Sequence, residues 1–208
     1  MSKAEILSSD HPQILDRAIS TLREGGVVAI PTDTVYGIAA DAWSGEAVSK
    51  LYEVKNRSEL KPIPVLLRGE EAVGEVAEDS SGRIRALAAK FWPGPLTIVV
   101  NRNSELPSEV SNSTTVGIRA PDHKLALALL KSFGPLATTS ANPSGLPTST
   151  TADQVIATLG GTIDLIIDDG ETGGGIPSTV ISIAVEPPRL LRQGPISIES
   201  VLRVWESY

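Results

Sequence analysis

The sequence predicts an α/β protein whose sheet contains both parallel and antiparallel strands. Short apolar runs bounded by Gly, Pro and Asp alternate with segments of helical periodicity, which is the pattern of layered α/β folds. Several successive runs are joined by links too short for a helix, and this favours a mixed sheet over a purely parallel one. No internal repeat, low-complexity linker or charge block interrupts the chain, so we expect a single domain over residues 1–208.

The first predicted elements are a helix, a strand and a second helix. The first helix opens near Asp10 and ends at Gly25-Gly26, because glycine is favoured just past a helix C-terminus. Residues 27–30 form a buried apolar strand, and residues 44–54 have the periodicity of the second helix.

The remaining elements follow from the same patterns. Strand-like runs occur at residues 64–67, 96–100, 116–119, 136–139, 165–167, 179–183 and 189–192. Helical patterns occur at residues 81–91, 123–133, 152–159 and 197–205. Aromatic residues make up only 4% of the chain, so Val, Ile, Leu and Ala must fill the core.

Composition and charge exclude several classes of protein. The chain has no cysteine, which excludes disulfides, a thiol nucleophile and cysteine-ligated metal centres. It shows no signal peptide and no apolar run of about 20 residues, so we expect a cytoplasmic protein that does not enter the membrane. The formal net charge of −7 argues against a dedicated nucleic-acid binder, although a basic cleft within an acidic protein is compatible with it.

Residues 31–37 follow the first buried strand directly, at the kind of place where α/β folds bind ligands. They supply the hydroxyl groups of Thr32 and Thr34, the carboxylate of Asp33 and the phenol of Tyr36. On this segment alone, a ligand-binding loop and a polar turn with a capping Asp are equally good interpretations.

A basic cluster follows the second helix. Lys55, Arg57 and Lys61 all fall within seven residues. Cations at a helix C-terminus are favoured by the helix dipole, which is a sufficient structural explanation. The functional alternative is a phosphate clamp, since the planar fork of Arg and the point charge of Lys both suit a polyphosphate.

Two arginines stand at the ends of apolar strands. Arg119 ends a strand that has Thr115 at its other end, and Arg192 precedes a Gly-Pro turn. If Arg119 is buried, its charge needs a partner. The carboxylate of a ligand and a structural Asp or Glu both meet that need.

Further polar and glycine-rich segments lie in the second half of the chain. Residues 138–145 and 148–151 are dense in hydroxyl and amide groups, which suit a phosphate, a carboxylate or a sugar. Alternatively, Thr150 or Thr151 caps the next helix. The glycine run at residues 173–175 lacks the Lys-Ser/Thr pair of a phosphate loop, and we interpret it as a flexible loop that lets the backbone approach a ligand.

The residue types that are scarce narrow the chemistry. The two histidines, His11 and His123, both stand at predicted helix starts, so a Ser–His–Asp triad is poorly supported, and no spacing resembles a metal cage. Cations and hydroxyl groups on strand-end loops instead suit transfer at phosphorus, which depends mostly on positioning and charge neutralisation.

Five motifs stand in the order seen in the YrdC-like family, at residues 31–37, 55–57, 116–119, 140–142 and 177–180. The resemblance covers the chain from about Ile6 to Ile198, and within the family it points to the L-threonylcarbamoyladenylate synthase branch. It implies a twisted mixed sheet with flanking helices and a concave, positively charged cavity. It also implies a reaction of L-threonine, bicarbonate and ATP with magnesium, which yields threonylcarbamoyl-AMP and pyrophosphate.

The resemblance further assigns roles to residues, position by position. L-Threonine would be held by Thr34, Arg119, Ser140 and Ser178. ATP would be held by Arg57, Lys61, Thr115, Asn142, Thr150 and Arg192. Lys55 and Arg57 would form the catalytic clamp, and no residue is assigned to a metal site. A separate downstream complex would transfer the threonylcarbamoyl group to tRNA, which this chain would contact only indirectly or weakly.

This sequence departs from the family pattern in two respects. Leu66 stands at about the place where many relatives have a histidine, so a hydrogen bond to substrate is absent or comes from elsewhere. Longer relatives also have a second, C-terminal domain, and this chain resembles the short form.

Three alternatives compete with this interpretation. The main one is an RNA-binding module of the same fold without nucleotidyl transfer, which the acidic charge and scarce aromatics disfavour. The second is the carbamoyl-adenylate-forming domain of hydrogenase-maturation enzymes, which normally sits in a longer chain with zinc-finger cysteines. The third is a paralogue without the Ser-x-Asn motif, which Ser140 and Asn142 disfavour.

Overall fold

A mixed sheet with flanking helices forms the architecture of the computed structural model, which describes residues 4–56, 62–78 and 82–208. The strands are β1 (Glu5–Ser8), β2 (Val28–Ile30), β3 (Gly37–Asp41), β4 (Val65–Leu66), β5 (Leu96–Asn101), β6 (Thr115–Arg119), β7 (Leu136–Ser140), β8 (Leu165–Asp168), β9 (Thr179–Ser182) and β10 (Arg189–Arg192). Within the described residues they form one ten-stranded sheet in the order β1-β8-β2-β3-β7-β4-β6-β5-β9-β10.

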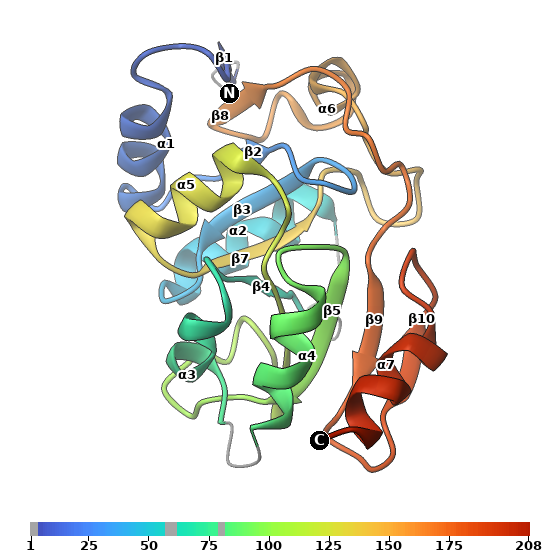
Figure 1. The fold of residues 1–208 in the computed structure, drawn as a ribbon. Helices are drawn as coiled ribbons and strands as arrows, with labels where there is room; N and C mark the ends of the chain where they lie inside the picture. Colours follow the sequence, from blue (N-terminus) through green and yellow to red (C-terminus); the bar gives the residue numbers. More distant parts are fainter. Residues whose placement is uncertain (1–3, 57–61, 79–81) are drawn as a thin grey trace.

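Both kinds of strand pairing occur in this sheet. The pairs β1–β8, β2–β8, β4–β6 and β5–β9 are parallel, whereas β2–β3, β3–β7, β4–β7, β5–β6 and β9–β10 are antiparallel. The predicted mixed α/β sheet is therefore confirmed. Figure 1 shows the sheet twisting from β1 and β8 at one end of the molecule to β9 and β10 at the other, with the two termini at opposite ends.

Helices cover both faces of the sheet. They are α1 (Ile14–Arg23), α2 (Gly45–Lys55), the 3₁₀ helix η1 (Glu70–Ala72), α3 (Val73–Val76), α4 (Arg83–Phe91), α5 (Lys124–Phe133), α6 (Ala152–Leu159) and α7 (Ile198–Glu206). Helices α1 and α5 pack on one core, and α2, α3, α4, α6 and α7 contribute to the other (Figure 1). No helix in the described ranges is both long and apolar enough to cross a membrane.

The two cores follow from the pleat of the strands. Val28 and Ala29 are neighbours in β2 but belong to different cores, and the same is true of Val65 and Leu66 in β4. Successive side chains of a strand point to opposite faces, so β2 and β4 each contribute to both cores. Small and aliphatic side chains make up most of both cores, as the scarcity of aromatic residues predicted, and the larger core also contains Tyr36, Tyr52 and Trp92.

The sequence patterns located most of these elements, with ends shifted by a few residues. They did not reveal β1, β3 or the short helices η1 and α3. Strand β1 is a short edge strand that alternates between half-buried and exposed residues, and β3 consists largely of Gly and Ala, which carry little strand signal. Strand β1 pairs with β8, and β3 pairs with β7. These backbone pairings define the two strands, whereas their composition does not.

Candidate active site

A cavity of about 470 Å³ opens on one face of the sheet, and residues of β5, β6, β7 and β9 contribute to its lining. Strand β6 shows how the pleat builds it. Thr115, Gly117 and Arg119 line the cavity, whereas Val116 and Ile118 between them lie in the core. A polar lining on one face and an apolar core on the other thus come from one strand.

The loop at residues 31–37 forms one wall and is held by its own hydroxyl groups. The Oγ1 atom of Thr32 accepts hydrogen bonds from the backbone N–H groups of Thr34 and Val35 at 3.2 and 3.3 Å, and it donates to the Val35 carbonyl at 2.7 Å. Both threonines are buried and line the cavity. The loop is therefore a polar turn in which Thr32 rather than Asp33 makes the capping hydrogen bonds, and it also forms a cavity wall. That it binds a ligand stays a prediction.

Arg119 lies in that wall and has partners on three sides. Its Nε donates to the Gly94 carbonyl at 2.9 Å, its Nη1 donates to the Thr34 hydroxyl at 3.1 Å, and its Nη2 forms an ion pair with Asp33. Burial lowers the pKa of Arg119, and the charge and hydrogen bond of Asp33 oppose that effect. Arg119 thus has a structural carboxylate partner and also faces the cavity.

Arg192 reaches the same cavity from β10. Its Nε donates to the Ser178 carbonyl at 3.0 Å, and its Nη2 donates to the Ser178 hydroxyl at 3.1 Å. The Ser178 hydroxyl also shares a hydrogen bond of 2.8 Å with Thr97 Oγ1. The register of β10 shifts between Leu190 and Arg192, and this irregularity lets the consecutive residues Leu191 and Arg192 both line the cavity.

Burial lowers the pKa of Arg192, and the positive charge of Arg119 lowers it further. The charge of Arg119 therefore acts on Arg192, and both side chains line the cavity. Such a pair of cations favours an anionic ligand placed between them.

Lys55 is buried at the C-terminal end of α2 and lies behind the cavity wall. Its ammonium group donates to the Ser140 carbonyl, to Ser140 Oγ at 3.3 Å and to Asn142 Oδ1 at 3.3 Å. The Nδ2 of Asn142 donates to the Leu146 carbonyl at 2.6 Å. Lys55 and Asn142 therefore shape the turn that follows Ser140, the last residue of β7, which lines the cavity.

The cavity brings together six of the residues to which the sequence assigned ligands. These are Thr34, Thr115, Arg119, Ser140, Ser178 and Arg192. They come from strand ends and loops far apart in the sequence, so the strand order accounts for their meeting. Which ligand each one holds stays a prediction.

Three of the other assigned residues, Lys55, Asn142 and Thr150, do not line the cavity. Lys55 and Asn142 are buried behind Ser140, as described above. Thr150 is outside the lining and its backbone N–H donates to Gln154 Oε1 at 2.8 Å, while Thr151 caps α6. Arg57 and Lys61 lie outside the described residues, so their predicted roles in the clamp stay predictions.

Sequence reasoning did not single out Thr97 and Leu191, which also line the cavity. Thr97 could have been recognised as a candidate site residue in the sequence, because it is the polar residue inside an otherwise apolar run. Leu191 could not, since its orientation depends on the irregular register of β10. Leu66 lies on the cavity wall beside Arg119, its register partner on β6, so this position presents an apolar side chain to the cavity.

The glycine-rich segment approaches the protein's own backbone. Gly175 N–H donates to the Thr34 carbonyl at 2.8 Å, and Thr172 Oγ1 donates to the same oxygen at 3.3 Å. A Cβ atom on Gly174 would lie 2.6 Å from the carbonyl oxygen of Asp33. The close approach that we expected is therefore made to the loop at residues 31–37, which this segment supports from behind.

Comparison with known proteins places this geometry in a family. Residues 20–194 match the Sua5/YciO/YrdC family, described as telomere recombination. The chain belongs to that family. A Bacillus subtilis relative named threonylcarbamoyl-AMP synthase is 41% identical over 198 residues, which cover 94% of this chain and 57% of the relative.

Two solved structures of this family share the fold. A structure of Pyrococcus abyssi Sua5 complexed with L-threonine has a TM-score of 0.91 and 35% identity, and the match covers 98% of this chain and 61% of that one. The Methanobacterium thermoautotrophicum protein MTH1692 has a TM-score of 0.71 and 36% identity, and the match covers 91% of each chain. The chain spans little more than half the length of the curated synthases from Bacillus and Pyrococcus, at 57% and 56%.

Proposed function

We propose that this protein is an L-threonylcarbamoyladenylate synthase, a nucleotidyltransferase that forms threonylcarbamoyl-AMP and pyrophosphate from L-threonine, bicarbonate and ATP. The observation that carries the proposal is the single cavity lined by Arg119 and Thr34 on one side and by Arg192 and Ser178 on another. An amino acid with a carboxylate and a hydroxyl group needs such donors, and a polyphosphate needs a cation. The Sua5 relative complexed with L-threonine supports the choice of amino acid.

The proposed chemistry needs no protein nucleophile. The amino group of threonine and bicarbonate give a carbamate and water. A carbamate oxygen then attacks the α-phosphorus of ATP, the bond to the bridging oxygen breaks, and pyrophosphate leaves with the electron pair. The protein's part is to orient the reactants and neutralise the charge on the leaving group.

Five residues of the cavity have a proposed part in this step. Arg119 and Thr34 would hold the threonine carboxylate and hydroxyl group together with Ser140 and Ser178. Arg192 would hold phosphate oxygens with its planar fork, helped by Arg57 and Lys61.

Magnesium would enter with ATP, because magnesium in such sites is bound largely by substrate phosphates and water. Among the described residues there is no group of three or more His, Cys, Asp or Glu side chains that would hold a metal ion independently. We further propose that the protein acts in the cytoplasm and hands its product to a separate complex that modifies tRNA.

Substrate-dependent release of pyrophosphate tests the proposal. With magnesium-ATP present, pyrophosphate should appear only when L-threonine and bicarbonate are both added. Release that is independent of threonine would contradict the assigned reaction. Salt-dependent RNA binding with no pyrophosphate release would favour the RNA-binding alternative.

A further inference from the structure

Arg119 and Arg192 line the same cavity but have different electrostatic surroundings. Arg119 forms an ion pair with Asp33. Arg192 donates to the carbonyl and hydroxyl oxygens of Ser178, and no carboxylate in the described part of the chain forms an ion pair with it. Of the two arginines that line the described part of the cavity, Arg119 therefore has a balanced charge and Arg192 does not.

Asp33 acts on the cavity from behind Arg119. Its side chain is 14% exposed, and it is not among the residues that line the cavity. Its backbone is fixed by Gly174, which leaves no room for a Cβ atom against the Asp33 carbonyl. The carboxylate therefore affects a ligand through the orientation and the charge of Arg119.

We propose that Asp33 is a specificity-determining residue that separates two anion subsites within the cavity. By balancing the charge of Arg119, it leaves that end suited to the single carboxylate of an amino acid. The polyphosphate is then directed to the Arg192 end. This inference rests on the proposed function, because it assumes that an amino acid and a nucleotide occupy the cavity together.

The physical reason is the different charge of the two ligands. A carboxylate with one negative charge binds a balanced Arg–Asp pair through directed hydrogen bonds from the guanidinium group. A polyphosphate has several negative charges and favours the place with the largest uncompensated positive charge. Without Asp33, both arginines would attract phosphate, and ATP would compete with the amino acid.

Asp33→Asn tests the proposal, since an amide oxygen keeps an acceptor for Arg119 while the charge is lost. Inorganic pyrophosphate is the probe, and calorimetry at two salt concentrations gives its affinity. We expect Asp33→Asn to bind pyrophosphate about tenfold more tightly than the original protein, because an unbalanced charge a few ångströms away is only partly screened. This gain in affinity for pyrophosphate should be smaller at the higher salt concentration, because salt screens the unbalanced charge.

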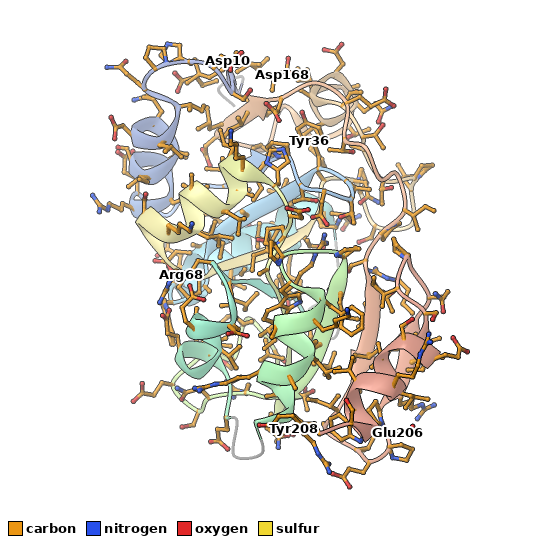
Figure 2. All side chains as sticks on the ribbon, viewed as in Figure 1. Asp10, Tyr36, Arg68, Asp168, Glu206 and Tyr208 are labelled. Carbon is orange, nitrogen blue, oxygen red and sulfur yellow. The ribbon has the colours of Figure 1, made fainter. Side chains whose placement is uncertain are left out.

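The matched control is Glu206→Gln, which makes the same change in net charge. Figure 2 shows Glu206 at the C-terminal end of the molecule, far from Tyr36, which lines the cavity. This variant should bind pyrophosphate as the original protein does. An equal gain in both variants, or no gain in Asp33→Asn, would overturn the proposal.

A double variant covers the case in which Asp33→Asn does not fold. Asp33→Asn with Arg119→Gln removes the ion pair as a unit and leaves the net charge unchanged. Its affinity for pyrophosphate should stay within about threefold of the original value, whereas Arg192→Gln should lose about tenfold or more. A tenfold loss in the double variant would show that Arg119 already binds phosphate, which contradicts the proposal.

Enzymatic turnover provides a second readout. It separates the proposal about Asp33 from the proposed synthase function. In Asp33→Asn, raising the ATP concentration should raise the KM for threonine, and in the original protein it should not. If the original protein makes no adenylate, the proposed function fails, and the pyrophosphate affinities still decide the role of Asp33. If the original protein is active and Asp33→Asn behaves identically, only the inference about Asp33 fails.

Discussion

Lys55 and Ser140 are joined through the ammonium group of Lys55, which donates to both the carbonyl and the hydroxyl oxygen of Ser140. This contact connects the end of α2 to the end of β7, elements that are distant in the sequence. It also brings Lys55 next to the hydroxyl-rich turn that the sequence indicated separately. Lys55 thus has a structural part whatever it contributes to catalysis.

Replacing Lys55 by Met should lower the stability of the fold. The change removes the donor from acceptor atoms of half-buried Ser140 and buried Asn142, and a buried group left without a partner costs about 1–3 kcal/mol. Unfolding in urea measures the loss. Lys90→Met on the exposed surface of α4 is the control and should change stability by no more than about 0.5 kcal/mol. Equal stability of Lys55→Met and the original protein would refute this role.

Replacing Arg192 by Lys should impair turnover while leaving the fold intact. The charge is kept, but the planar fork that contacts Ser178 and would contact phosphate is lost. We expect kcat/KM for ATP to fall by roughly a hundredfold, the usual effect of removing one well-placed electrostatic donor. Arg189→Lys, at an exposed position of the same strand, is the control. Turnover within twofold of the original in both variants would contradict a phosphate-binding role for Arg192.

Two neighbouring glycines provide a matched pair of variants. A Cβ atom on Gly174 would lie 2.6 Å from the Asp33 carbonyl oxygen and 2.9 Å from Thr34 Cα, whereas one on Gly173 would meet nothing within 4 Å. Gly174→Ala should therefore displace the loop at residues 31–37 and raise the KM for threonine by about tenfold or more, because small displacements in a site have large effects. Gly173→Ala should leave the KM unchanged. Similar kinetics for the two variants would show that this packing does not position the threonine subsite.

The proposed threonine subsite should form hydrogen bonds with the substrate's hydroxyl group and so discriminate against amino acids that lack it. Thr34, Ser140 and Ser178 place hydroxyl groups on the cavity wall, and such a site leaves buried polar groups unpaired when an analogue lacks its own hydroxyl. Adenylate formation with valine should be roughly a thousandfold or more slower than with threonine. Serine, which lacks only the methyl group, should be roughly tenfold to two-hundredfold slower. Comparable kcat/KM values for valine and threonine would be incompatible with this subsite.

Local sequence signals predicted much of the fold and part of the site. Alternating strands and helices bounded by Gly and Pro gave the mixed sheet, and the polar loops after buried strands located Thr34 and Ser140 in the cavity wall. The partner of Arg119 could not be chosen from the sequence, because Asp33 lies 86 positions away and meets it only through the strand order. The orientation of Leu191 depends on a shift in strand register, which leaves no mark in the residue pattern.

Incorporation of carbon-labelled bicarbonate into a nucleotide product tests the central claim most directly. The protein is incubated with labelled bicarbonate, L-threonine and magnesium-ATP, and the products are separated and identified by mass. We predict a labelled species that contains both AMP and the threonylcarbamoyl group and that is missing when threonine is omitted. Pyrophosphate should form in equal amount. If AMP-containing products carry no label although the protein is folded and binds ATP, then this chain does not form threonylcarbamoyl-AMP.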